Sequence, residues 1–345
     1  MTESSFLAAV RADPDDRLLR LAFADWLEES DDSRSELIRI EEEMRRLPVF
    51  ADRFWELKPR RNELRATLPP EWLAAMRYGT VCEPVFRHGL PDGWRERWRL
   101  IREFVERWCR IPMPDVGGRG DEIREAETRL GRTLPPSVRE YVAFAHDVHQ
   151  DEDFVDVFRD AYQMVDLAGC AALSLLLQCE GDHHWAILHA DLGGDDPRVS
   201  EFLSDFDTQD QTFIPHQRNP THPTVTSFVL DYTFSYTNGI GGGFGTEIRD
   251  ANPLLRDLEA TYPVQAVFGK TRIFEGDDIY VRVAPNQGRP GHLVVVELSA
   301  AMPREAIPEY LWNLTHQGGS FHGMFIPERH NVSLAERTGP HDIPV

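Results

Sequence analysis

The apolar residues of this chain keep a helical spacing through residues 1–112, and strand-like runs appear only beyond that point. Phe6, Leu7 and Val10 share one helical face. Residues 111–118 contain two prolines and two glycines, which are poor helix formers and predict a linker. Helical and strand-like segments are mixed after the linker. The pattern therefore predicts the α+β class, with an all-helical module ahead of a part that mixes helices and strands.

Length and composition set the number and the kind of domains. The 345 residues correspond to about two domains of ~150 residues each. We predict a helical module at residues 1–50, a helical connecting region at 51–112, an α+β domain at 113–250, and C-terminal strands and a helix at 251–345 that extend the same sheet or form a subdomain. No apolar stretch approaches the ~20 residues that cross a bilayer, and the N-terminus lacks the basic start of a secretory signal. We therefore expect a cytoplasmic protein.

The net charge of −21 is unevenly distributed along the chain. Residues 113–250 contain 9 basic and 25 acidic side chains, which gives 9 − 25 = −16 for this segment alone. Such a field repels a phosphate backbone, so we expect no nucleic acid partner. The same field would accelerate association with a cationic protein. A merely solvated acidic surface is the alternative that charge alone leaves open.

A strongly amphipathic stretch precedes the linker and carries Trp94, Trp98 and Trp108 on or near one stripe. Such a stripe needs a neighbour, either as core packing or as a partner-binding face. The interleaved arginines form the basic cluster of the chain. They are either the solvated back of this helix or the partners of the acidic middle segment.

The first 50 residues resemble a known bacterial module. The segments Ala24-Asp25-Trp26-Leu27-Glu28-Glu29 and Glu36-Leu37-Ile38-Arg39 have the spacing of the repeat-companion domain, and the similarity covers about residues 2–47. Members of that family have no established chemistry and are fused to varied partner domains. The resemblance implies an adaptor and not a catalyst.

The segment after the linker, IREAETRLGRTLPPSVREYVAFA, resembles the opening of the SUKH superfamily. Glu127, Leu130 and Gly131 match its acidic first helix, and Leu134-Pro135 matches its proline corner. The similarity extends over about residues 96–240. Members include the yeast cell-wall assembly regulator and many bacterial immunity proteins. The resemblance implies an α+β fold, a mixed sheet flanked by helices, that binds another protein, with a basic toxin domain as the partner in the immunity case.

The candidate binding residues follow a predicted hairpin. We predict strands at 173–179 and 185–189 and an acidic loop at 191–199. Trp185 is the candidate partner-binding anchor, and Asp191, Asp195 and Asp196 are the candidate acidic rim. Each has a plainer alternative, because Trp185 suits a core and the acids suit a solvated loop. A regulatory scaffold that binds a cellular protein, without a toxin, is the alternative function.

Catalysis is the third hypothesis, and its residues lie in the same hairpin. Imidazoles and carboxylates there suggest a metal-dependent hydrolase, although no H-E-x-x-H spacing occurs. The cluster consists of Cys179, Glu180, Asp182, His183, His184, His189 and Asp191. The glycine-rich run 238–246 lacks the lysine and serine of a phosphate loop and is interpreted as a flexible loop after a helix at 228–236 that Ser227 caps. We therefore expect no cofactor, no metal and no enzyme activity.

Overall fold

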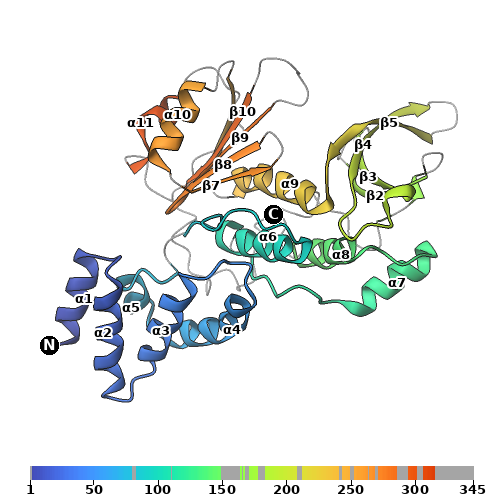
Figure 1. Ribbon diagram of the computed structural model, residues 1–345. Coiled ribbons are helices and arrows are strands. Elements are labelled where there is room, and N and C mark those ends of the chain that lie inside the picture. The colour runs from blue at the N-terminus through green and yellow to red at the C-terminus, as the bar shows by residue number, and fades with distance from the viewer. Residues whose placement is uncertain are drawn as a thin grey trace, which may run out of the picture.

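The structure is a computed structural model of the whole chain (Figure 1). It describes fourteen stretches of the sequence, and every structural statement below refers to them. They are 2–79, 83–109, 111–148, 164, 166–167, 171–177, 183–207, 212–240, 243–248, 252–262, 264–268, 271–285, 294–300 and 306–314.

Five helices form the N-terminal helical module, which we define as residues 2–79. They are α1 (Glu3–Ala12), α2 (Arg17–Glu28), α3 (Arg34–Met44), α4 (Asp52–Thr67) and α5 (Pro70–Ala75). The rings of Phe6 and Phe23 stack with centroids 4.9 Å apart, which joins α1 to α2. Arg39 of α3 donates to Asp25 at 2.8 Å and to Glu28 at 2.6 Å on α2. The two segments that carry the repeat-companion resemblance are therefore held together by ion pairs.

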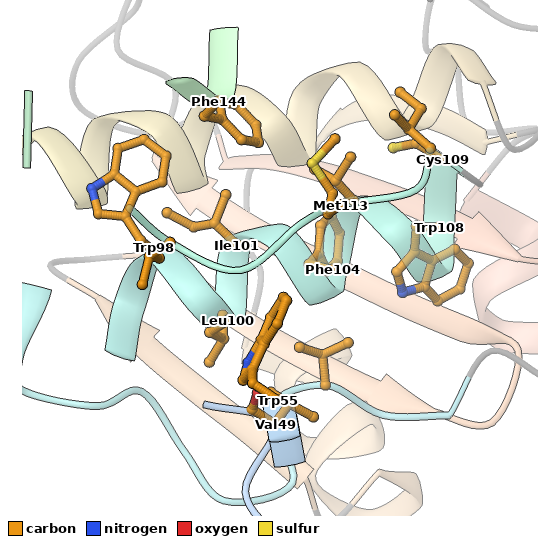
Figure 2. Close-up of a cluster of buried hydrophobic side chains, with 14 of the residues drawn as sticks. Val49, Trp55, Trp98, Leu100, Ile101, Phe104, Trp108, Cys109, Met113 and Phe144 are labelled. Atoms are coloured by element: carbon orange, nitrogen blue, oxygen red, sulfur yellow. The ribbon is translucent and has the colours of Figure 1, made fainter. Parts of the chain in front are cut away.

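Helix α6 (Trp94–Cys109) runs through the middle of the molecule, between the helical module and the two sheets (Figure 1). Its tryptophan stripe is core, since Trp98 is fully buried and Trp108 is 3% exposed. Figure 2 shows that its side chains pack on two sides. Leu100 points toward Trp55 of α4, and the Phe104 ring lies 5.4 Å from the Tyr280 ring of β9, measured between centroids. Helix α6 thus packs against the helical module and the second sheet within one core.

The first sheet lies beside helices α7 (Gly120–Leu130), α8 (Pro136–Val148) and α9 (Val225–Ile240) (Figure 1). Its strands are β1 (Asp166–Leu167), β2 (Ala172–Leu177), β3 (His183–Leu188), β4 (Val199–Asp207) and β5 (Thr212–His222). They pair antiparallel in chain order, β1-β2-β3-β4-β5. A bulge between Ser174 and Leu176 shifts the register of β2 against β3.

The second sheet has the order β6-β10-β9-β8-β7 and is also antiparallel. Its strands are β6 (Gly243–Ile248), β7 (Val264–Phe268), β8 (Thr271–Gly276), β9 (Ile279–Pro285) and β10 (Val294–Ala300). Helices α10 (Asn252–Thr261) and α11 (Glu309–Leu314) cover one face. Because successive strand residues point to opposite faces, Phe274 joins that layer while Ile273 joins the core around α6.

The α+β class with an N-terminal helical region is confirmed, and three details differ from the sequence prediction. The strands beyond residue 250 do not extend the first sheet, and β6 at 243–248 pairs with β10, so a sheet crosses the predicted boundary at 250. The described residues of the glycine-rich run are helix and strand and not a loop, because α9 continues to Ile240 and β6 begins at Gly243. The cap of α9 is Thr224, whose Oγ1 accepts from Ser227 N at 3.0 Å.

Candidate functional site

The predicted acidic loop, residues 191–199, begins at the last residue of the short helix η2 (His189–Asp191) and ends at the first residue of β4; we call it the docking loop. Asp196 holds this loop. Its carboxylate accepts hydrogen bonds from Ser137 Oγ at 2.8 Å, Thr226 N at 3.1 Å and Thr226 Oγ1 at 2.5 Å. Ser137 and Thr226 lie in the first turns of α8 and α9, where backbone N–H groups lack helical partners. One carboxylate therefore joins the starts of two helices, where negative charge is favourable.

Two further hydrogen bonds extend this network. The backbone carbonyl of Asp195 accepts from Ser137 N at 2.9 Å, which fixes a second point of the loop. Trp98 Nε1 donates to Ser137 Oγ at 2.9 Å, and both of these residues are fully buried. The docking loop is thereby tied through α8 to α6 at the centre of the molecule.

The candidate rim acids differ in orientation. Asp195 is exposed, and Asp191 and Asp196 are both half-buried. Both oxygens of the Asp196 carboxylate accept hydrogen bonds from the helix starts, so Asp191 and Asp195 are the rim acids without that role. Asp166 of β1 adds a carboxylate that sequence reasoning missed, with His189 Nε2 2.9 Å from its Oδ1 and Arg132 Nη2 3.0 Å from its Oδ2.

Trp185 is part of the core. Its side chain is 9% exposed, and its ring lies 5.0 Å from the Tyr232 ring and 6.4 Å from the Phe228 ring, measured between centroids. These contacts join β3 to α9. The predicted anchor role needs an indole at the surface, so the plainer core interpretation of Trp185 agrees better with this geometry.

The residues of the hydrolase hypothesis are only partly described. Cys179, Glu180 and Asp182 lie outside the described residues, as does the side chain of His183. His184 is 8% exposed and lies on the face of β3 opposite to Trp185, because adjacent strand residues point to opposite faces. His189 contacts Asp166. Within the described ranges no three histidine, cysteine, aspartate or glutamate side chains are grouped so that they could hold a metal ion.

A buried charged seam joins α4 to α6, and sequence reasoning missed it. Lys58 Nζ lies 2.8 Å from Glu103 and 2.9 Å from Glu106, and Arg107 Nε lies 2.7 Å from Glu103. Burial alone would raise the pKa of Glu103, but the charges of Lys58, Arg107 and Arg61 lower it to about 2. The signal was present in the sequence, because Lys58 falls on the same helical face as the apolar Trp55.

Two other arginines of α6, Arg99 and Arg102, are also paired with acids. Arg99 binds Asp115 through two hydrogen bonds of 2.9 Å, and Arg102 donates to Asp147 at 2.9 Å. Both aspartates belong to the acidic middle segment, residues 113–250. For these two arginines the second alternative is confirmed, and part of the acidic charge of the segment is neutralised inside the molecule.

The comparisons with known proteins give no further assignment. Neither a protein-family model nor a curated protein nor a solved structure matches the chain. The resemblances to the repeat-companion and SUKH families therefore remain predictions that depend on the residues quoted above. Within the described part of the chain, none of the helices combines the length and the apolar character of a bilayer span.

Removing the Asp196 carboxylate should cost more stability than removing that of its neighbour. Asp196→Ala leaves Ser137 Oγ and Thr226 N without their acceptor, and we expect a loss of about 2–3 kcal/mol in the free energy of unfolding. Asp195→Ala keeps the backbone acceptor and should stay within about 0.5 kcal/mol of wild type. Urea unfolding measures both, and equal effects would contradict the role of Asp196.

Proposed function

We propose that this protein is a non-catalytic protein-binding protein of the immunity type. Its docking loop would receive a basic partner such as a toxin domain. The observation that carries the proposal is the loop itself, which Asp196 ties to two helix starts while Asp191 and Asp195 reach solvent. A surface that is already ordered loses little entropy when it binds.

Charge supports the same interpretation. The segment around the loop, residues 113–250, has a net charge of 9 − 25 = −16. Rim charges act mainly on the association rate, because they steer a partner of opposite sign before contact. Since Trp185 is buried, the loop and its neighbour Asp166 are the groups that would meet the partner first.

The test is affinity capture from lysates of the native cell with a tagged protein. We expect a basic protein to be retained by wild type and lost with Asp191→Arg/Asp195→Arg, and its association should slow about tenfold in a purified pair. Retention should weaken as salt rises from about 0.1 to 0.5 M. The matched control is Glu56→Arg/Glu63→Arg, which makes the same change of charge on exposed positions of α4.

The identity of the retained protein separates the two protein-binding hypotheses. A toxin domain supports the immunity assignment, whereas a housekeeping protein favours the regulatory scaffold. Equal retention by the loop variant and the α4 control would contradict docking at this loop. Asp196 is left unchanged in this design because its replacement would disturb the starts of α8 and α9.

A further inference from the structure

The second sheet contacts the chain that leaves the helical module. We define the connector as residues 83–86, which follow that module and precede α6. Phe86 N donates to Glu275 Oε2 of β8 at 2.7 Å, across 189 positions of sequence. Arg107 Nη1 of α6 donates to the Glu83 carbonyl at 2.8 Å, and the Phe86 and Phe104 rings lie 6.2 Å apart. The connector is therefore bound on two sides.

Glu275 is an unusual residue for this position. Its side chain is 1% exposed, and among the described residues Oε1 has no hydrogen-bond partner of normal geometry although it is buried. Burial raises the pKa of Glu275 to about 7, against the opposing effects of the Val85 and Phe86 amides and of Arg107. An ionised carboxylate in this place is only partly compensated, whereas a protonated one has little desolvation cost.

Further charged groups surround the connector, and they belong to the helical module, to the connector itself and to the second sheet. Arg45, after α3, lies 3.2 Å from Glu83 Oε1. In the β8–β9 turn Asp277 lies 3.8 Å from Arg77 of the helical module. Burial would raise the pKa of Glu83, but Arg107, Arg45 and Arg87 lower it, so Glu83 stays charged at neutral pH.

We propose that Glu275 is a proton-operated latch that holds the connector on the second sheet. The protonated carboxyl stays buried and accepts the Phe86 amide. When it releases its proton to solvent, the carboxylate gains hydration by leaving the site, so the connector opens. The closed state binds the proton more tightly than the open state, and by linkage a rise in pH favours opening.

Hydrogen exchange at the Phe86 amide tests the latch in the full chain. In wild type we expect its protection factor, corrected for intrinsic exchange, to fall by about 30-fold between pH 5.5 and 8.5, as linkage requires when the pKa shifts from 4.5 in the open state to about 7 in the closed state. In Glu275→Gln the amide keeps an acceptor of the same shape without a titrating proton, so its protection should be constant within about twofold.

Two further measurements make the result decisive. Glu259→Gln should behave as wild type. This variant removes an exposed carboxylate of α10 that pairs with Arg272 of β8, the strand that contains Glu275. Within wild type, the Ile187 amide of the first sheet should remain more protected than the Phe86 amide at pH 8.5, because the connector opens without global unfolding. The latch is overturned by a flat profile at Phe86, by equal protection of both amides at pH 8.5, or by a wild-type profile in Glu275→Gln.

Discussion

Glu103→Gln should lower the free energy of unfolding at pH 7 by about 3–5 kcal/mol, since it removes the carboxylate bound to Arg107 and one of the two carboxylates bound to buried Lys58. Glu103 is 1% exposed, and its carboxylate lies 2.8 Å from Lys58 Nζ and 2.7 Å from Arg107 Nε. Glutamine keeps the shape of the side chain, so the loss reports charge and not volume. Urea unfolding of the two proteins gives the difference.

The effect of Glu103→Gln should depend on pH in a defined direction. The pKa of Glu103 is lowered to about 2 in the folded protein, against 4.5 in the unfolded chain. Its contribution is therefore present above pH 4.5 and is lost as the pH falls toward 2. The matched control is Glu36→Gln, whose exposed carboxylate binds Arg60 at 2.6 Å and should cost less than about 1 kcal/mol. Equal costs for the two variants would show that the seam does not stabilise the fold.

Trp185→Ala should cost about 3–5 kcal/mol of stability, because a large ring is removed from the contact between β3 and α9. The ring is 9% exposed and has Tyr232 and Phe228 as aromatic neighbours. Thermal or urea unfolding measures the loss. Wild-type stability in this variant would mean that Trp185 is not part of the core.

A second substitution separates packing from partner binding. Trp185→Phe keeps an aromatic ring against Tyr232 and should retain most of the stability. If it also retains the captured partner, the anchor role predicted from the sequence is excluded. If it folds but loses the partner, the indole contributes to recognition despite its burial.

Local signals in the sequence predicted much of this fold. The helical periods placed the N-terminal helices and α6, and the strand-like runs placed β2 and β3, because each pattern depends on residues close in sequence. The second sheet was not predicted as a unit. Its edge strand β6 begins in a glycine-rich run and obtains its partner β10 from about 50 residues further along, which no local pattern reveals.

The sequence predicted where the acidic loop lies, but it did not predict which of its aspartates binds the helix starts. The sequence located an acidic loop after a hairpin, but Asp195 and Asp196 look alike in sequence. Only the folded chain brings Ser137, 59 positions away, against the second carboxylate. The same limit applies to Lys58 and Glu103, which are 45 positions apart. Buried polar partners are set by tertiary contacts and leave little trace in composition.

Because α6 packs against both the helical module and the second sheet, recombination of such chains cannot exchange the module independently of α6. If the first 79 residues were replaced by those of another protein, α6 would lose its contact with Lys58. Glu103 would then be buried beside a side chain that does not neutralise it. Inheritance should therefore keep the two positions together. Residues 2–79 and α6 should therefore be inherited as one structural unit.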